Sequence, residues 1–593
     1  MQNNHFFSKT KNQLLLLLLL AVGINFNTLF NEYALDDQVV LTGNQLVQKG
    51  LRGIPQLCTT DFFYGFTGEG SGLSGGRYRP VALIIFAIEH QFFGDNTFIS
   101  HSINILLFLL VIILLYKLLQ KHIFKEYQPY LAFITCLLFV VHPIHTEVIA
   151  NVKSRDELIV FLLLLTSSFA LIKHNEESKI GHLIAGLSCF FLALLTRESA
   201  VPFILIFPLV AYFFFNQSIK KSILISIPLI IVFAIYMILR ISIVGFSYSN
   251  KGDILDVPFL YASATEAFAT KMFILLKYIC LLIFPHPLSS DYSYNQIPYI
   301  RLASIQFVFP FLVIFGLTLF AFFKLKKRSI FSFCILYFLM TIFLFSNFVM
   351  DIGAPLAERL LFQPSLAICI LFATGFLYLN KNYKKTSTTF LVILVISFSA
   401  KTIIRNRVWK NDETLFFTDV NNAPNSLKTN IHAAKFYILK AKSESNAELK
   451  NEYFRKAVFY DERALKIDAN NRYIYLGLGA AYFGLNNYLK AADMWLQSYQ
   501  MDPSHEDEKN RLNELSNFLL NEGTKIFQNG NTKSAISYYK KAIELNTNNV
   551  EAWYFLGGVY FNLNDTKNGI QAWQYVLKLD PNHQFNKTAF SIQ

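Results

Sequence analysis

The chain has 593 residues, of which 53% are apolar, 16% aromatic and 16% charged, with a formal net charge of +13. Because a globular domain usually carries about 25% charged residues, a wholly soluble protein is excluded and most of the chain is predicted to lie in a membrane. Most basic residues of the apolar part stand in short clusters between apolar runs. Membrane insertion produces this pattern, so we predict no nucleic-acid partner.

The composition changes near residue 403. Phe, Leu and Ile dominate before this point, and Asn, Lys, Glu and Tyr dominate after it. We predict a transmembrane domain at 1–403, a polar linker at 404–425 and a repeat domain at 426–593. The scattered cysteines indicate neither a disulfide framework nor a CxxC metal pair.

Eleven apolar runs are long enough to be predicted as membrane-spanning helices. The first follows Lys9 and Lys11 but has no small-x-small cleavage site, so we interpret it as an uncleaved span. Two other runs are set apart: 81–93 is too short and is predicted to lie along the outer surface, and 268–284 is predicted to be re-entrant, interfacial or packed in the bundle. The predicted spans are 11–30, 100–120, 129–147, 157–173, 182–196, 200–215, 222–244, 305–323, 329–350, 361–380 and 387–403.

The basic clusters fix the predicted orientation of these spans. They occupy every second connection, and such clusters normally face the cytoplasm. The N-terminus is therefore predicted to be cytoplasmic, and the first loop (31–99) and the C-terminal repeats extracytoplasmic. The clusters are Lys9 with Lys11, 117–125, 173–179, 220–221, 324–328 and 381–385.

Ionisable residues gather at the outer ends of the predicted spans, where charges are costly and are candidates for function. Each has a plainer explanation alone, such as a solvated loop start, a structural ion pair or an interfacial anchor. Their convergence on one face of the bundle favours a site. The candidates are Asp36, Asp37, Arg77, Arg79, His101, His142, His145, Glu147, Arg155, Asp156, Glu157, Arg197, Glu198, Asp351, Glu358 and Arg359.

Carboxylates and arginines at a membrane surface suit the attack of a hydroxyl on a sugar whose leaving group is a lipid phosphate. A carboxylate takes the acceptor proton, and guanidinium groups neutralise the departing phosphate. Of Asp36 and Asp37, one can be this base, with Asp36 favoured, while the other holds an arginine or a divalent cation such as Mg²⁺ or Mn²⁺. The spacing of His142, His145 and Glu147 is a weak metal signal, and the sequence identifies no cofactor.

The order of these motifs resembles a known family, the transmembrane and tetratricopeptide-repeat-containing O-mannosyltransferases. The resemblance extends along almost the whole chain. It is carried by Asp36-Asp37, Arg77-Tyr78-Arg79-Pro80, His101 and Asn104, the run from His142 to Glu147, Arg155-Asp156, Arg197-Glu198, the run from Glu358 to Ser365, and Trp409 with Asp412.

The resemblance implies a GT-C glycosyltransferase that uses a polyprenyl-phosphate sugar, with the acidic motif at Asp36 and Asp37. It also implies that Glu358 and Arg359 lie near the donor phosphate. We add three arginines to the predicted substrate-binding set, and seven other candidates are kept as further members of the site. The added arginines are Arg79, Arg155 and Arg197, and the further members are Arg77, His101, His142, His145, Glu147, Asp156 and Glu198.

Two departures from the family pattern leave the sugar and the acceptor open. The first loop carries a Gly-rich insert at 65–76, and Gln363 stands where the family often has Tyr or Leu. The composition also fits a bacterial member, in which an undecaprenyl-phosphate sugar would be the donor and the outer side would be the periplasm. In animal members the donor is dolichyl-phosphate mannose and the acceptor a protein hydroxyl.

The C-terminal part repeats the tetratricopeptide pattern of 34 residues. The final position of the pattern, usually proline, falls at residues 469, 503, 547 and 581. The third unit is therefore longer than the others and is predicted to carry a ten-residue insertion near 504–513. Each unit is a helix pair that stacks on the next, and such arrays form a groove suited to a peptide. We predict that the aromatic residues of the pattern are core, and that the groove holds an acceptor protein or a partner.

Two other function classes stay open. A non-catalytic membrane scaffold is the main alternative, because tetratricopeptide arrays mostly bind partners. It predicts that substitution of Asp36 or Asp37 leaves function intact. A transporter predicts ionisable residues near the bilayer midplane, whereas here they gather at one surface.

Overall fold

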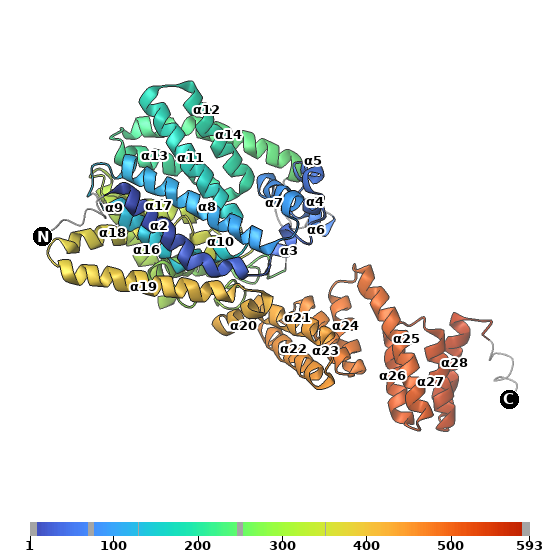
Figure 1. Cartoon of the computed structure of the whole chain (residues 1–593). Coiled ribbons are helices and arrows are strands. Elements are labelled where there is room, and N and C mark those ends of the chain that lie inside the picture. Colours follow the sequence, from blue (N-terminus) through green and yellow to red (C-terminus); the bar gives the residue numbers. More distant parts are fainter. Residues whose placement is uncertain (1–8, 69–75, 129, 246–252, 350, 584–593) are drawn as a thin grey trace. The chain divides into compact units, whose positions relative to one another are not determined.

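The computed structural model describes residues 9–68, 76–128, 130–245, 253–349 and 351–583, which form helices joined by loops and turns (Figure 1). No strand occurs among these described residues, so the predicted all-α class is confirmed. The chain divides into two compact units, which are residues 1–426 and 427–593. We call them unit 1 and unit 2.

Each of the eleven predicted spans contains a helix of unit 1 in its described residues. Six helices among the described residues are long and apolar enough to cross a membrane, and the bent pair Leu131–Val141 and Pro143–Ala150 would make a seventh. Four others are shorter apolar helices. The six are α2 with η1 (Thr10–Phe30), α8 with η3 (Thr97–Ile123), α11 (Arg155–Glu177), α14 (Ile219–Val244), α16 (Ile305–Leu325) and α19 (Lys384–Val408); the shorter ones are α12 (Ile180–Thr196), α13 (Phe203–Phe214), α17 (Ile330–Phe343) and α18 (Ser365–Asn380).

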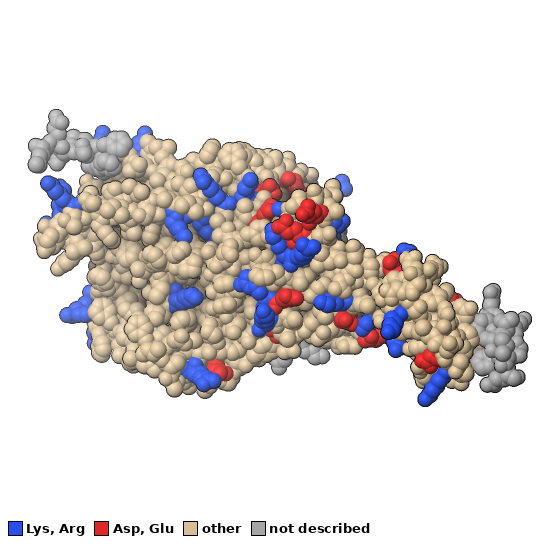
Figure 2. Space-filling model, turned by 90° about the horizontal axis from the view of Figure 1, so that it is seen from below, with Lys and Arg blue, Asp and Glu red and all other residues tan. Residues whose placement is uncertain are grey.

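The outer helices of unit 1 expose apolar side chains. Ile230 and Ile238 of α14 and Phe309 and Phe323 of α16 are among the exposed residues. Large areas of the face seen in Figure 2 carry no charged side chain. This surface fits the predicted contact with a lipid bilayer, because exposed apolar patches of this extent are rare on soluble monomers.

The first loop folds into short helices with an apolar core of their own. These are α3 (Asp37–Val40), α4 (Gln45–Gln48), η2 (Gly50–Gly53), α5 (Ile54–Leu57), α6 (Tyr64–Thr67) and the longer α7 (Pro80–Phe93). Val47, Phe62 and Phe86 are buried in this core. Most of the predicted Gly-rich insert, residues 69–75, lies outside the described residues.

The first and last predicted spans pack against each other. The Asn406 side chain in α19 donates to the Ile24 carbonyl of α2 at 3.0 Å. The segment 404–425, predicted as a linker, instead contains the end of α19 and the helix α20 (Asp412–Asn422), with Leu415 buried. One face of this polar segment packs against the rest of unit 1, with Leu415 in an apolar cluster with Ala34 and Trp409.

The predicted apolar run 268–284 corresponds to α15 (Ala264–Ile283), which packs against α16 and α18. It begins with a capping box, in which the side chains of Ser263 and Glu266 satisfy the free amide groups of the first turn. It is not among the helices that pass the length and composition test for a span.

Proline residues interrupt three of the helical segments. Pro143 follows the end of α9 (Leu131–Val141), and the chain bends by 53° before it continues into α10 (Thr146–Ala150). Pro202 and Pro364 directly precede α13 and α18. Because proline cannot donate a backbone hydrogen bond and its ring blocks the preceding helical turn, the polar residues beside these breaks lie on short turns.

The described part of unit 2 consists of four helix pairs, as the repeat pattern predicts. They are α21 (Leu427–Ser443) with α22 (Ala447–Ile467), α23 (Arg472–Gly484) with α24 (Tyr488–Met501), α25 (Glu506–Gln528) with α26 (Thr532–Leu545), and α27 (Val550–Asn562) with α28 (Thr566–Leu579). Helix α25 has 23 residues where α23 and α27 have 13. The predicted insertion is therefore an extension at the start of α25.

Candidate active site

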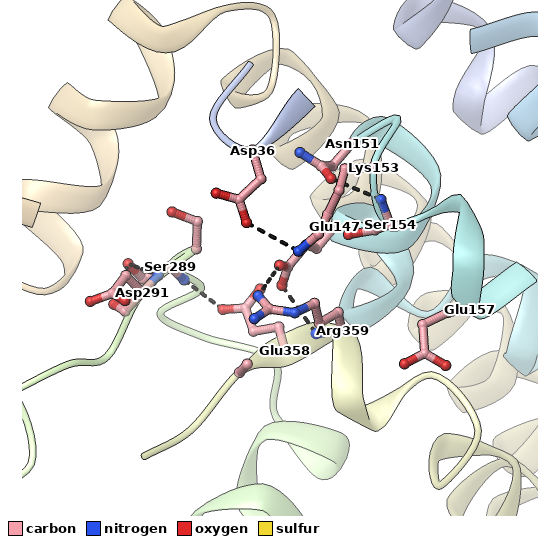
Figure 3. A network of polar contacts seen from close by, with 12 residues as sticks. Asp36, Glu147, Asn151, Lys153, Ser154, Glu157, Ser289, Asp291, Glu358 and Arg359 are labelled. Carbon is pink, nitrogen blue, oxygen red and sulfur yellow. Dashed lines mark hydrogen bonds and ion pairs between the residues drawn. The ribbon is translucent and has the colours of Figure 1, made fainter. Parts of the chain in front are cut away.

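The candidate site lies on short turns of unit 1 that come from distant parts of the chain. Asp36 immediately precedes α3, Lys153 lies between α10 and α11, and Arg359 lies in η6 (Glu358–Leu361). Figure 3 shows these side chains directed toward one another. Acidic and guanidinium groups from remote segments therefore meet, as the sequence predicts.

The two adjacent aspartates have different environments. Asp37 is buried, and its carboxylate accepts hydrogen bonds from the backbone N–H groups of Ala34 at 3.0 Å and Lys153 at 2.7 Å. Burial raises the pKa of Asp37 to about 7, although these two hydrogen bonds favour the charged form. The Asp36 side chain is 41% exposed, and its Oδ2 lies 3.1 Å from the Lys153 ammonium. Asp37 thus holds the loop, and Asp36 is the carboxylate that a substrate can reach.

The loop that carries Asp36 is held from two sides. The Asp412 carboxylate accepts from the Leu35 N–H at 2.7 Å, and the Asn151 side chain donates to the Ala34 carbonyl at 3.4 Å. Nearby, Trp409 is fully buried. Trp409 shares an apolar cluster with Ala34, so Trp409 and Asp412 both help to fix the position of the acidic motif.

Arg359 is fixed by a bidentate contact with Glu147. Glu147 Oε1 lies 2.7 Å from Arg359 Nη1, and Glu147 Oε2 accepts from the Arg359 backbone N–H at 3.0 Å. The Glu147 side chain is 3% exposed, whereas that of Arg359 is 21% exposed. The guanidinium is therefore oriented by a buried partner while part of it stays accessible.

A second ionic cluster surrounds Arg197. Its guanidinium contacts Asp156 at 2.8 Å and Glu157 at 3.0 Å. Arg79 contacts Glu198 at 2.7 Å and Asp156 at 3.7 Å, so the two arginines share Asp156. These side chains are mostly buried, and this network rigidly joins the start of α11 to the end of α12 and the first loop.

Arg77 differs from these arginines because its guanidinium forms no salt bridge with any described residue. It lies 5.4 Å from the centroid of the Phe63 ring, and its Nη2 is 3.5 Å from the Ile352 carbonyl oxygen. Burial and the neighbouring Arg79 lower the pKa of Arg77 to about 10. A cation without a neutralising carboxylate is well suited to an anionic ligand.

Glu358 has a different role from its neighbour in the chain. Its carboxyl accepts from the Ser289 N–H at 2.5 Å and from the Tyr292 hydroxyl at 2.7 Å. Burial raises the pKa of Glu358 to about 8. It therefore anchors the segment after α15, and Arg359 forms its ion pair with Glu147 and not with Glu358.

Four other predicted site residues are buried within the protein. Arg155 is fully buried, forms an ion pair with Glu89 and donates to the Asn104 side chain at 2.6 Å and the Ser100 carbonyl at 2.8 Å. The structure thus separates Arg155 from the accessible cations, and its substrate-binding role stays a prediction. The three histidines are likewise buried: His142 contacts the Leu282 carbonyl at 2.9 Å, His145 contacts the Ser365 hydroxyl at 2.8 Å, and His101 lies within α8.

Asp36 and Asp37 are not arranged as the ligands of one cation. Asp37 binds two backbone amides and Asp36 binds an ammonium, so the two carboxylates do not converge on one point. No group of three or more potential metal ligands lies together in the described parts of the chain. The arrangement of the acidic pair therefore disfavours the divalent cation that we considered from the sequence.

Sequence reasoning missed Lys153. Its ammonium contacts Asp36 and its backbone N–H contacts Asp37, so one residue holds both members of the acidic pair. A signal for it exists in the sequence, because Lys153 lies in a segment predicted to be extracytoplasmic. Basic residues there run against the usual cytoplasmic bias.

An apolar cavity of about 70 Å³ lies inside the bundle. Its lining includes Leu115 of α8, Phe161 of α11, Phe203 of α13 and Gln363. Gln363 also lies 3.5 Å from the carbonyl oxygen of Ser199, the residue whose hydroxyl donates to Glu157 at 2.9 Å. The cavity thus reaches the residues that border the ionic cluster of Arg197.

Residues 78–246 match the family described as Dolichyl-phosphate-mannose-protein mannosyltransferase. Two overlapping segments of unit 2, residues 523–564 and 550–583, match tetratricopeptide-repeat families. The first match covers the segments that carry Arg79, Glu147 and Arg197. The matches to unit 2 confirm the predicted repeats.

Several animal proteins are similar to this chain. Protein O-mannosyl-transferase TMTC1 of Homo sapiens is 26% identical over 69% of this chain and 51% of its own length. Protein O-mannosyl-transferase F38B6.6 of Caenorhabditis elegans is 26% identical over 71% of this chain and 59% of its own length. Protein O-mannosyl-transferase TMTC3 of Homo sapiens is 23% identical over 94% of this chain and 67% of its own length.

The chain thus spans about half to two thirds of the length of these relatives. Together with the family matches, they confirm the resemblance that the order of the motifs indicates.

Proposed function

We propose that this chain, a relative of the transmembrane and tetratricopeptide-repeat O-mannosyltransferases, transfers mannose from a polyprenyl-phosphate donor to a protein hydroxyl on the extracytoplasmic side. The observation that carries this proposal is the meeting of an accessible carboxylate, Asp36, with two cations from remote turns, the buried Lys153 and the partly accessible Arg359. The names of the relatives support mannose as the sugar and protein as the acceptor.

Asp36 is the proposed general base. It is half-exposed on a loop held by Asp37 and Asp412, so its position is fixed while its carboxylate can approach an acceptor. As the acceptor oxygen attacks the anomeric carbon of the donor sugar, the hydroxyl proton moves to Asp36. General-base catalysis of this kind contributes about 10²- to 10⁴-fold in rate.

The proposed phosphate site uses Arg359 and Arg77. Arg359 is oriented by Glu147, and Arg77 has no carboxylate partner among the described residues. Guanidinium groups bind phosphate oxygens in a forked geometry and are always charged near neutral pH. They stabilise the second negative charge that the phosphate acquires when the sugar–oxygen bond breaks.

The lipid tail of the donor has a candidate place in the apolar interior of the bundle. The cavity beside Gln363 is lined almost wholly by apolar side chains and borders the ionic cluster. At 70 Å³ it holds only a small part of a polyprenyl chain. The remainder would lie along the exposed apolar faces of the helices, in the bilayer.

Unit 2 is the proposed binding site for the acceptor protein or for a partner. Tetratricopeptide repeats present concave surfaces that bind extended or helical peptides. Its regular helix pairs and buried aromatic residues, such as Tyr475 and Tyr539, support a folded array with a free surface.

Transfer assays with the full chain in lipid vesicles test the proposal. The donor is a radiolabelled polyprenyl-phosphate mannose, the acceptor is a folded protein rich in exposed Ser and Thr, and the glucose donor is the matched control. We expect labelled acceptor from the mannose donor, with the label released by mild alkaline elimination and transfer unchanged by a metal chelator. An absence of label from every donor would contradict the proposed function, and transfer from the glucose donor alone would contradict the assignment of mannose.

A further inference from the structure

Lys153 contacts both aspartates of the acidic motif, Asp36 through its ammonium and Asp37 through its backbone N–H. Its side chain is 9% exposed and its ammonium lies 3.1 Å from Asp36 Oδ2. Its backbone N–H donates to Asp37 Oδ1 at 2.7 Å, so the position of the lysine is fixed by the same loop that it contacts. An ammonium has three N–H donors, and the Asp36 contact engages one of them.

The surroundings of Lys153 point toward the proposed phosphate site. The charged groups that act on its ammonium are Asp36, Arg359, Asp156 and Arg197. Figure 3 shows the lysine between Asp36 and the pair formed by Glu147 and Arg359. A phosphate bound by Arg359 would therefore lie within reach of the same ammonium that holds the proposed base.

We infer that Lys153 follows the negative charge during transfer, binding Asp36 before the reaction and the leaving phosphate as the reaction proceeds. This inference rests on the proposed function. The bond between the acceptor oxygen and the anomeric carbon forms, and the bond between that carbon and the phosphate oxygen breaks. The hydroxyl proton goes to Asp36, which becomes neutral, while the electron pair of the broken bond stays on the phosphate, which becomes a dianion.

The gain for the transition state comes from this exchange of partners. As Asp36 accepts the proton, its carboxyl becomes neutral and attracts the Lys153 ammonium less strongly. The phosphate gains negative charge at the same moment. A cation placed between the two groups is thus bound more tightly in the transition state than before it, which is the condition for raising kcat. Lys153 is therefore expected to affect kcat more than the KM for the donor.

The burial of Lys153 adds a pH signature to this role. Desolvation lowers the pKa of Lys153 to about 8, although the neighbouring Asp36 favours the charged form. The ammonium is then present below about pH 8 and is lost as the pH rises further. Transfer should fall on the alkaline side with a midpoint near this pKa, whereas an arginine at the same position stays charged.

The test compares Lys153→Met and Lys153→Arg with wild type and with Lys125→Met, a substitution of an exposed lysine, in the vesicle assay with polyprenyl-phosphate mannose. We expect Lys153→Met to lower kcat about 10²-fold, the usual effect of removing one stabilising group, with little change in KM. Lys153→Arg should keep activity within about tenfold and should extend it above pH 8. Lys125→Met should match wild type in rate and pH profile.

Two results would overturn the inference while the proposed function stands. One is a folded Lys153→Met variant with wild-type kcat. The other is a Lys153→Arg variant whose activity falls at the same alkaline pH as wild type, and this comparison decides the matter even where the methionine variant does not fold. A wild-type protein without any transfer would instead overturn the proposed function, and this inference with it.

Discussion

Unit 1 and unit 2 are both all-helical, but different interactions determine their local structure. In unit 2 a small residue on one helix receives an aromatic ring from the next, as Gly557 does with Trp573. Both residues belong to one repeat, so the pattern predicts the contact. In the site of unit 1, Glu147 and Arg359 are 212 residues apart and meet only because the bundle brings two turns together. Local periodicity thus explains unit 2, and long-range pairing of charges explains the site.

Apart from substitution of the proposed base, Asp36, we expect the largest loss of activity from substitution of Arg359. Arg359→Gln removes the guanidinium that the proposed mechanism places on the phosphate, and we expect transfer to fall about 10²- to 10³-fold. Arg301→Gln, at an exposed position of unit 1, is the matched control and should transfer at the wild-type rate. Equal rates for Arg359→Gln and wild type, at equal amounts of folded protein, would refute the role of Arg359.

Substitution of Arg155 should lower the stability of the protein and not its rate of transfer, because the contacts of Arg155 are all internal. Arg155→Met leaves the Glu89 carboxylate buried without its charge partner, and breaking a buried ion pair in this manner usually costs about 3–5 kcal/mol. We expect a clearly lower thermal unfolding temperature in detergent. The fraction that stays folded should transfer mannose within a few-fold of wild type, and a stable but inactive variant would show that Arg155 belongs to the site after all.

A pair of neighbouring glycines tests the packing of unit 2. A Cβ on Gly557 would lie 2.4 Å from Trp573 Cδ1, whereas a Cβ on Gly558 would meet nothing within 4 Å. We expect Gly557→Ala to destabilise unit 2 by about 1–3 kcal/mol through overpacking. Gly558→Ala should instead stabilise it by about 0.5–1 kcal/mol, because alanine favours the helix.

Denaturant unfolding followed by tryptophan fluorescence measures both variants. Equal effects of the two substitutions would mean that the contact between Gly557 and Trp573 does not control the packing of this repeat.

The smallest effect concerns pH and Glu358. Because burial raises the pKa of Glu358 to about 8, the folded state binds a proton that the unfolded state releases between about pH 4.5 and 8. Stability should therefore fall as the pH rises through this window. Asp37, with a pKa raised to about 7, acts in the same direction.

Glu358→Gln keeps an acceptor for Ser289 and Tyr292 but cannot ionise. The unfolding temperature of this variant should fall less between pH 5 and pH 8.5 than that of wild type, by a few degrees. An identical fall in both proteins would show that Glu358 does not titrate in this range.

The sequence predicts the helices of this protein better than it predicts which side chains contact one another. Apolar runs and the 34-residue period locate the helices, because burial against lipid or against the next repeat leaves a local pattern. The same reasoning ranked Arg155 with Arg359, since both stand at the outer end of a predicted span. Only the fold distinguishes them, because Arg155 meets Glu89 and Asn104 inside the bundle while Arg359 remains accessible.

Lys153 was missed for a related reason. A lysine in a predicted extracytoplasmic segment is only a weak signal in the sequence, and its importance comes from a contact with Asp36, 117 residues earlier. The sequence identified the acidic motif as part of the site, but it did not show that its two aspartates have different roles. These roles depend on which of the two carboxylates accepts hydrogen bonds from the backbone N–H groups of Ala34 and Lys153.

Comparison of Asp36→Asn with wild type is the most direct test of the central claim. Single-turnover transfer from radiolabelled polyprenyl-phosphate mannose is measured in vesicles at matched amounts of folded protein, as judged by thermal unfolding. We predict that Asp36→Asn binds the donor and unfolds at the wild-type temperature, yet transfers mannose at least about 10³-fold more slowly. Transfer by Asp36→Asn at the wild-type rate would contradict the assignment of Asp36 as the base and, with it, our account of the site.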